Sequence, residues 1–349
     1  MAIIDMTRRR RPRSRIVRLG TVFPVVLALC SGLLAACGSG DADGLTTVTV
    51  GVANTIFDAP VRVADAKGYF RAAGLKVKFV DLPSSLGAAA LESDSVQFLN
   101  SSPTAFINAV NRKIPQLAVH MDGAGSPLGL IVSTKFAQAH HLTADTPPAD
   151  VAKALRGSVG GASSATTKGQ AGIFLREYGV SPNTIRYASL PSPAADKAAL
   201  SNNQIDWFVT SEPTPLAVQA DGDGIVVAGP DTVPGWSVAN TGYGQIVAVR
   251  QDYAGKNAGM VRRFVQAVQQ GTAYIRGHEA DVVGIVKQTF SGLDDSVLLA
   301  SLRQVDWPAD GGMSADGWNT SLKFIHSTNA VPKSAAIPRS NWTNEYLPR

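Results

Sequence analysis

A pattern that occurs twice constrains the fold more than any other feature of the sequence. The first copy starts at Ala89-Ala90-Leu91 and, four residues later, continues as Val96-Gln97-Phe98-Leu99. The second starts at Ala198-Ala199-Leu200 and, after the same interval, continues as Ile205-Asp206-Trp207-Phe208. An apolar helix end, a polar turn and a buried strand explain each copy. Two copies with identical spacing predict two α/β lobes that are built alike. The alternative is a coincidence between two ordinary helix–turn–strand units.

Polar residues follow the strand of each copy, and a proline follows them. The first copy continues with Ser101 and Ser102, and the second with Thr210, Ser211 and Glu212. Open α/β sheets bind ligands at the carboxyl ends of their strands, often at the N-terminus of the next helix. These five residues are therefore candidate ligand contacts. For Glu212 two roles stay open: it contacts a polar or cationic end of the ligand, or it caps its own helix.

Length and charge exclude several classes of protein. The chain has 349 residues, which is enough for two domains, and its 17% charged and 45% hydrophobic residues are typical of a globular protein. The formal charge of +5 comes from residues 1–36, which hold seven arginines and one acid. The remaining residues are close to neutral, so the sequence predicts no nucleic-acid partner.

Residues 1–36 are interpreted as a signal peptide. An arginine-rich start precedes an apolar stretch, 22–36, and the sequence Leu34-Ala35-Ala36-Cys37 resembles the bacterial lipobox, whose cysteine receives a lipid. The alternative is an uncleaved membrane anchor, but the apolar stretch is shorter than the ~20 residues that a spanning helix needs. We therefore expect lipidation at Cys37, a flexible tether over 37–45, and an extracytoplasmic protein anchored to a bacterial membrane. The export route, general or twin-arginine, stays open.

The residues after the tether predict the first lobe. Alternating valines indicate a strand over 46–53, and a helix over 59–66 stops at Gly68. A second strand spans 75–80. The exits of these two strands add further candidate ligand contacts. They are Asn54, Thr55, Phe57, Asp58, Ser84 and Ser85.

The same stretch resembles a known family. Residues 59–77 fit the pattern A-P-x-x-x-A-x-x-x-G-Y-F-x-x-x-G-L-x-V, which is typical of extracytoplasmic solute-binding proteins that serve ABC importers for sulfonates, nitrate and thiamine precursors. The strand pattern and Glu212-Pro213 are similar to the same family. This chain has Asp94 and Asn203 where the family has glycine, and Gln97 where it has aspartate. Asparagine suits such a position because it also adopts the left-handed conformation.

The resemblance implies an α/β fold of two Rossmann-like lobes, the type II periplasmic binding protein fold, with a helical C-terminal block. It places lobe I at 46–128 and 248–349 and lobe II at 129–247, joined by two crossover segments. In lobe II, Ser163, Ser164 and Thr166 follow a strand and join the candidate ligand contacts. Trp236, beside the second crossover, is a further candidate. Packing on the protein surface is the alternative for both Phe57 and Trp236.

No motif for catalysis, nucleotide binding or metal binding occurs in the sequence. We therefore predict a binding protein without catalytic residues, cofactor or metal. Its expected partners are a small polar or anionic solute, the permease and ATPase subunits of an importer, and the membrane through the lipid. We expect a monomer. Two alternatives are an enzyme similar to thiamine-pyrimidine synthases, whose cysteine-rich motif is missing here, and a sensor lipoprotein.

Overall fold

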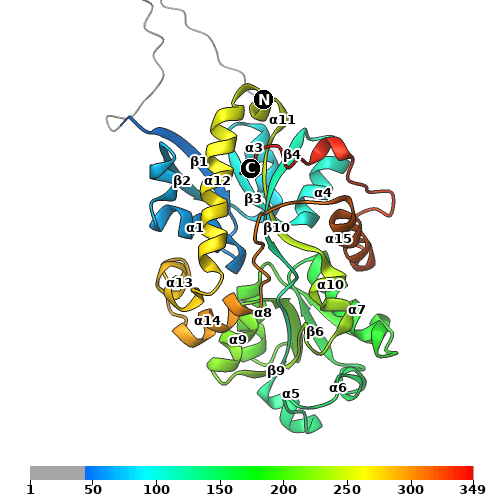
Figure 1. The fold of residues 1–349 in the computed structure, drawn as a ribbon. Helices are drawn as coiled ribbons and strands as arrows, with labels where there is room; N and C mark the ends of the chain where they lie inside the picture. The colour runs from blue at the N-terminus through cyan, green and yellow to red at the C-terminus, as the bar shows by residue number, and fades with distance from the viewer. Residues whose placement is uncertain (1–43, 349) are drawn as a thin grey trace, which may run out of the picture. The chain divides into compact units, whose positions relative to one another are not determined.

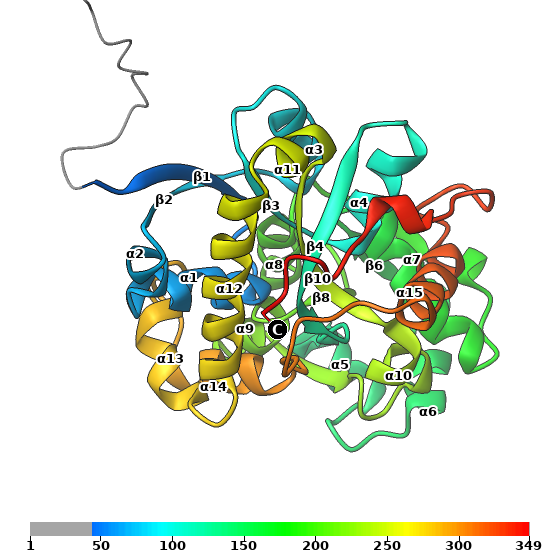
Figure 2. The ribbon, with the colours of Figure 1, turned by 45° about the horizontal axis from the view of Figure 1, so that its top comes forward.

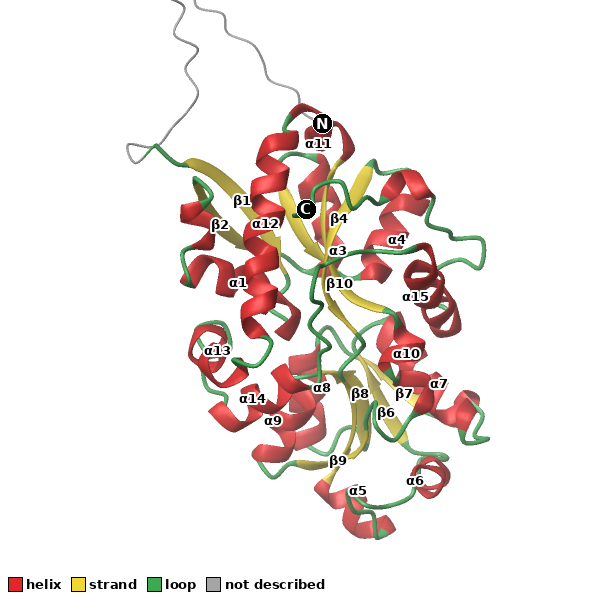
Figure 3. Cartoon of the chain, in the orientation of Figure 1, coloured by secondary structure: helices red, strands yellow, loops and turns green. Residues whose placement is uncertain are grey.

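The computed structural model describes residues 44–348 (Figure 1). The predicted signal peptide, Cys37 and nearly all of the tether lie outside these residues. None of the helices in the described part is long and apolar enough to cross a membrane. The strands form two five-stranded sheets, which are drawn in yellow in Figure 3.

The first sheet has the order β2-β1-β3-β10-β4. β1, β2 and β3 are parallel, whereas β10 runs antiparallel to both β3 and β4. The valines Val48, Val50 and Val52 of β1 are all buried, as their alternation predicted. The strands are β1 (Thr46–Val52), β2 (Leu75–Asp81), β3 (Phe98–Ser101), β4 (Gln116–Ala124) and β10 (Tyr243–Arg250).

Helices cover both faces of this sheet. On one face Phe98 of β3 stacks on Phe264 of α12, with 3.6 Å between the ring centres, and Phe70 of α2 stacks on the same ring. On the other face Leu99 packs against residues of α3 and α4. This first lobe comprises η1 (Ile56–Asp58), α1 (Ala59–Ala66), α2 (Tyr69–Ala72), α3 (Ser84–Glu92), α4 (Pro103–Asn111), α11 (Gln251–Lys256) and α12 (Ala258–Ile275).

The second sheet has the order β7-β6-β8-β5-β9, with β5 antiparallel to its neighbours β8 and β9. Its strands are β5 (Leu128–Ser133), β6 (Val159–Ala162), β7 (Arg186–Ser189), β8 (Trp207–Ser211) and β9 (Gly224–Ala228). The second lobe adds α5 (Thr134–His140), α6 (Pro148–Ala154), α7 (Ala165–Glu177), η2 (Pro182–Thr184), α8 (Pro193–Ser201), α9 (Thr214–Ala220), η3 (Pro234–Trp236) and α10 (Val238–Thr241). The segment between β9 and β10 thus contains η3 and α10.

The C-terminal elements are α13 (Glu279–Val286), α14 (Asp295–Arg303), α15 (Ala315–Thr328) and η4 (Arg339–Asn341). α15 contributes to the cores of both lobes, and Figure 2 shows it beside α7. Trp318 stacks on Phe106 of α4, whereas Phe324 and Ile325 pack in the core of the second lobe. The connecting segment 304–314 runs along β4, where Ala124 and Asp306 exchange two backbone hydrogen bonds. The C-terminal block thus forms a third connection between the lobes.

The two copies of the sequence pattern have matching local structure. Asp94 and Asn203, which replace the family's glycine, have φ angles of 59° and 55°. The Gln97 Oε1 atom accepts a hydrogen bond from the Thr49 amide, and the Asp206 Oδ2 atom accepts one from the Val159 amide, at 2.9 and 2.7 Å. In both copies this side chain therefore ties its turn to the neighbouring parallel strand. An amide oxygen serves this purpose as well as a carboxylate does.

Candidate functional site

The carboxyl ends of β1, β2, β3 and β4 lie at one edge of the first sheet, because these strands run in the same direction. In the second sheet β6, β7, β8 and β9 share an edge in the same way. The predicted ligand residues therefore gather at one edge of each sheet. Within each lobe, the structure brings together the exits of β1 and β3, and the exits of β6 and β8.

The exit of β1 is held by a buried carboxyl group. Asp58 accepts hydrogen bonds from the Thr55 amide at 2.9 Å and from the Asn100 Nδ2 atom at 2.8 Å. Asn100 also donates to the Phe57 carbonyl oxygen at 3.2 Å, so it joins this loop to β3. Asp58 directly precedes α1 but makes no side-chain hydrogen bond to the start of this helix. Burial raises the pKa of Asp58 to about 6, and the bonds from Thr55 and Asn100 and the charge of Arg62 oppose this rise.

Asn54 precedes this loop with a φ angle of 54°, and its Oδ1 atom accepts a hydrogen bond from Arg62 at 3.0 Å. The hydroxyl oxygen of Thr55 is buried and has no hydrogen-bond partner among the described residues. Asn54 therefore has a partner within the first lobe, whereas the Thr55 hydroxyl group has none in the described part.

The two predicted aromatic contacts lie in the core. Phe57 is 7% exposed and meets the edge of Trp307, with 6.4 Å between the ring centres. Trp236 is fully buried against Phe174, and its indole N–H donates to the Gln170 carbonyl oxygen at 3.2 Å. The interpretation of Trp236 as a ligand contact is therefore wrong for this structure, since its only polar atom is already bonded inside the lobe.

The serines after β2 and β3 begin helices. Ser102 caps α4, because its hydroxyl oxygen accepts the Ala105 amide at 3.2 Å. Ser101 is buried and donates to the Ser102 carbonyl oxygen. Ser84 and Ser85 form the first turn of α3, and Ser85 is exposed. A hollow of about 10 Å³ lies beside Ser101 and Ser102, with room for about one water molecule.

The exits of the second lobe follow the same plan. Ser164 caps α7, where its hydroxyl oxygen and that of Thr167 each accept the other residue's amide at 3.1 Å. Ser163 and Thr166 are half-buried beside it. Thr210 is buried in β8, and Ser211, the last residue of this strand, is half-buried. The cap leaves the other backbone N–H groups at the start of α7 free for an anionic or polar group.

Glu212 is 2% exposed and follows β8 directly. Its Oε2 atom accepts the Leu216 amide of α9 at 3.1 Å, so the carboxyl group does cap its own helix. Its Oε1 atom lies over Gly129 of β5, 3.3 Å from where a Cβ atom would stand. Burial raises the pKa of Glu212 to about 8, and the single Leu216 bond opposes this only in part.

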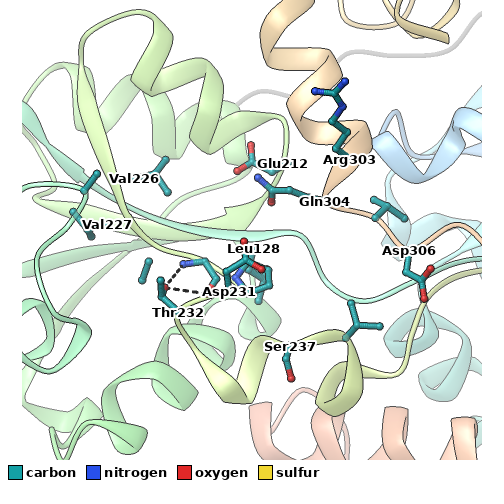
Figure 4. Close-up of a pocket in the computed structure, with 16 residues that line it drawn as sticks. Leu128, Glu212, Val226, Val227, Asp231, Thr232, Ser237, Arg303, Gln304 and Asp306 are labelled. Atoms are coloured by element: carbon teal, nitrogen blue, oxygen red, sulfur yellow. Dashed lines mark hydrogen bonds between the residues drawn. The ribbon is translucent and has the colours of Figure 1, made fainter. Parts of the chain in front are cut away.

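A pocket of about 650 Å³ opens beside Glu212 (Figure 4). The start of β5, the end and exit of β9, α10 and the end of α14 surround it, together with Ala144. Glu212 is the one sequence-predicted ligand residue in its wall. The lining residues are Leu128, Ala144, Glu212, Val226, Val227, Ala228, Gly229, Pro230, Asp231, Thr232, Ser237, Val238, Arg303, Gln304, Val305 and Asp306.

Sequence reasoning missed most of this wall. The exit of β9, Gly229-Pro230-Asp231-Thr232, is a polar segment after a predicted strand, so the rule applied to the other strands would have found it. Residues 303–306 carry no local signal, since only the tertiary packing of α14 brings them to the pocket. A second hollow of about 590 Å³ shares Val305 and Asp306 with the first and reaches Arg276 and Trp307.

The described residues hold no group of three or more histidine, cysteine, aspartate or glutamate side chains suited to a metal. A buried pair lies on β4, where the His120 Nδ1 atom is 2.7 Å from Asp122, and Gln269 lies 3.2 Å from the other ring nitrogen. Burial raises the pKa of Asp122, and its hydrogen bond with His120 opposes this. Through Gln269, the pair connects β4 to α12.

Comparisons with known proteins point to one family and one fold. The family model described as NMT1/THI5 like matches residues 57–281. The periplasmic aliphatic sulphonate binding protein SsuA from Escherichia coli superimposes with a TM-score of 0.66 at 16% identity, over 84% of this chain and 91% of its own. The periplasmic nitrate-binding protein NrtA from Synechocystis PCC 6803 gives 0.62 at 15% identity, over 83% of each chain.

The desulfurization enzyme DSZB has the same fold, with a TM-score of 0.60 at 14% identity, over 82% of this chain and 93% of its own. No curated protein sequence matches the chain. The comparisons confirm the predicted two-lobed α/β architecture of periplasmic binding proteins. At 14–16% identity the solved structures establish the fold alone.

Proposed function

Because the chain belongs to the NMT1/THI5-like family, we propose that it is the solute-binding protein of an ABC importer. It captures a small polar or anionic solute between its lobes and delivers it to the permease and ATPase subunits. The observation that carries this proposal is the pair of sheets whose carboxyl edges both bear polar strand exits. Structural neighbours named as sulphonate- and nitrate-binding proteins support it.

The proposed solute contacts are the exits of β1, β3, β6 and β8. Ser102 and Ser164 cap α4 and α7, so both helices begin at these exits with free N–H groups and a partial positive charge. A bound polar group gains ~0.3–1 kcal/mol from each such terminus. We take lobe I as 46–128 and 248–349 and lobe II as 129–247, with closure about the two crossovers and the C-terminal block.

We further propose that a lipid on Cys37 anchors the protein to the outer face of the membrane. Two or three acyl chains, at ~0.8 kcal/mol for each buried CH₂ group, hold a protein firmly. The Cys37→Ser variant should leave the membrane fraction or remain uncleaved. If it fractionates and migrates like the wild type, the anchor is not a lipid on this residue.

An enzymatic role finds its support in the shared fold of DSZB. The two cysteines of this chain, Cys30 and Cys37, both lie in or next to the proposed signal peptide. A cysteine-based site in the lobes is therefore excluded, and binding is the function that we favour.

Calorimetry with the full chain tests the proposed site. We expect ethanesulfonate, nitrate or another small solute to bind with 1:1 stoichiometry. Ser102→Ala and Thr166→Ala should each weaken this binding by ~1 kcal/mol, as for a lost hydrogen bond. Ser334→Ala, which changes an exposed serine outside the proposed strand exits, is the control. Unchanged affinity in both test variants would place the solute elsewhere.

A further inference from the structure

The carboxyl group of Glu212 has one oxygen that the fold does not use. Its Oε2 atom accepts the Leu216 amide, whereas no hydrogen bond from the described residues reaches its Oε1 atom. The side chain is nevertheless only 2% exposed, and it forms part of the wall of the 650 Å³ pocket. Since Glu212 lines the pocket, a ligand there can donate a hydrogen bond to the Oε1 atom.

The ionisable groups around this pocket are mostly acidic. Asp231, at the exit of β9, and Asp306, on the connecting segment, are exposed, and neither makes an ion pair with the described residues. Arg303 is the one cationic side chain in the wall. Figure 4 shows it extending along α14, away from the middle of the pocket. The pocket therefore presents three carboxyl groups against one guanidinium.

The rest of the wall combines polar groups, such as Thr232 and Ser237, with apolar residues. Leu128, at the start of β5, and Val226 and Val227, in β9, lie on the side of the second lobe. Val238, which is 39% exposed, lies on α10. A ligand that fits this wall combines an apolar body with a group that donates hydrogen bonds to carboxylates.

We propose that this pocket binds a small organic cation, with its protonated nitrogen at Glu212, its hydrocarbon part against Val238, and the Asp231 carboxylate adding negative charge to the wall. The inference rests on the proposed function. It names the chemical class of the solute, or of the part of the solute that contacts the second lobe. It differs from the anion that the helix N-termini alone suggest.

The pH dependence of binding distinguishes a cation from an anion. The pKa of Glu212 is about 8, so at neutral pH the carboxyl group is mostly protonated. A cation favours the carboxylate, so its binding releases a proton and tightens as pH rises towards 8. An anion requires the protonated form, and its binding weakens over the same range. The other ionisable groups in the pocket wall are Asp231, Asp306 and Arg303, and none of them contributes to the raised pKa of Glu212; Gly129 of β5 and Leu216 of α9, which contact Glu212, carry no charge.

Three probes with one four-carbon body separate charge from apolar contact: n-butylamine, 1-butanol and butane-1-sulfonate. Calorimetry with the full chain should detect butylamine at concentrations where butanol gives no heat. Its affinity should rise about tenfold for each step of one in pH between pH 6 and 7.5, because one proton leaves for each molecule bound. In buffers of different ionisation enthalpy, the observed heat should report the same proton release.

Variants test which side chains cause the affinity for butylamine and its pH dependence. Glu212→Gln should abolish the pH dependence, and Asp231→Asn should weaken butylamine binding at least threefold while it keeps the pH dependence. Glu92→Gln, an exposed acid on α3 outside the pocket, is the control and should change neither. Asp231 lies on an exposed loop, so its variant keeps the test valid if Glu212→Gln fails to fold.

Three results would overturn the inference: no butylamine binding at 20 mM, binding that neither variant alters, or tighter binding of the sulfonate. If the sulfonate binds and depends on Ser102 and Thr166, the cation is excluded while the proposed function stands. If none of the probes and none of the solutes tested above bind, the proposed function fails as well.

Discussion

Each lobe has one buried carboxyl group at the exit of a strand, and the two groups are bonded differently. Asp58, after β1, uses both oxygens, which accept the Thr55 amide and the Asn100 side chain. Glu212, after β8, uses one oxygen, which accepts the Leu216 amide. Burial raises both pKa values, to about 6 for Asp58 and to about 8 for Glu212. Asp58 thus has two donors that hold the loop after β1 in place, whereas Glu212 has one donor and a second oxygen that can accept a hydrogen bond from a ligand.

The largest expected effect is a gain in stability. The folded pKa of Glu212 is raised from 4.5 to about 8, so the stability it contributes is full below pH 4.5 and is lost as pH rises through 8. Because a tenfold change in an acid dissociation constant corresponds to ~1.4 kcal/mol, the loss is on the order of 5 kcal/mol. Glu212→Gln keeps the Leu216 bond through its amide oxygen and cannot ionise. Urea unfolding should find this variant several kcal/mol more stable than the wild type at pH 9 and equal to it at pH 4.5.

If the free energies of unfolding of Glu212→Gln and the wild type differ by the same amount at pH 4.5 and pH 9, the raised pKa of Glu212 does not cause the difference. Glu92→Gln, which removes an exposed carboxyl group, should show no pH-dependent difference.

Asn100→Ala tests the other half of the comparison. It removes the donor that holds Asp58 and the Phe57 carbonyl oxygen, and should cost ~1–3 kcal/mol of the free energy of unfolding. Since the Asn100 bond lowers the pKa of Asp58, its loss raises that pKa further, and the cost should be larger at pH 8 than at pH 4.5. Asn108→Ala, whose amide makes one bond of 3.4 Å to Ala330, is the matched control. Equal losses in the two variants would mean that Asp58 does not depend on Asn100.

The serine caps should have a smaller effect. Ser102→Ala and Ser164→Ala each remove one cap from a helix that begins at a proposed ligand contact. We expect each to cost ~1 kcal/mol in thermal unfolding, and Ser85→Ala to cost less than half as much. Both caps therefore have a structural role besides any contact with solute, so binding data on these variants must be read beside their stability.

The sequence predicted those parts of the fold that local rules control. The left-handed conformation expected at Asn203 is present, and Asp94 adopts it too. The hydrogen bonds from Gln97 and Asp206 to the neighbouring strands were not predicted, although they too depend on residues close to each turn. The repeat was informative because each copy ends a helix, makes a turn and enters a buried strand, and nearby residues control all three steps.

Long-range packing decided the rest. Residues 303–306 reach the pocket because α14 and the connecting segment fold back on both lobes, and no pattern within those residues records this. The role of α15 in two cores has the same origin. For Glu212 the sequence left open whether it caps its helix or contacts a ligand; the cap is present on one oxygen, and the pocket lies beside the other.

Trp236 offers the smallest expected effect and the last test of the comparison. Its ring is enclosed by the second lobe, and its N–H is bonded to Gln170, so ligand in the pocket should not change its surroundings. Trp307 is 5% exposed, adjoins Val305 and Asp306, and meets Phe57 from the first lobe. In a fluorescence titration with butylamine, Trp236→Phe should therefore keep the wild-type affinity within twofold and the full change in emission, whereas Trp307→Phe should lose most of that change. The reverse result would move the solute from the pocket beside Glu212 to the second crossover.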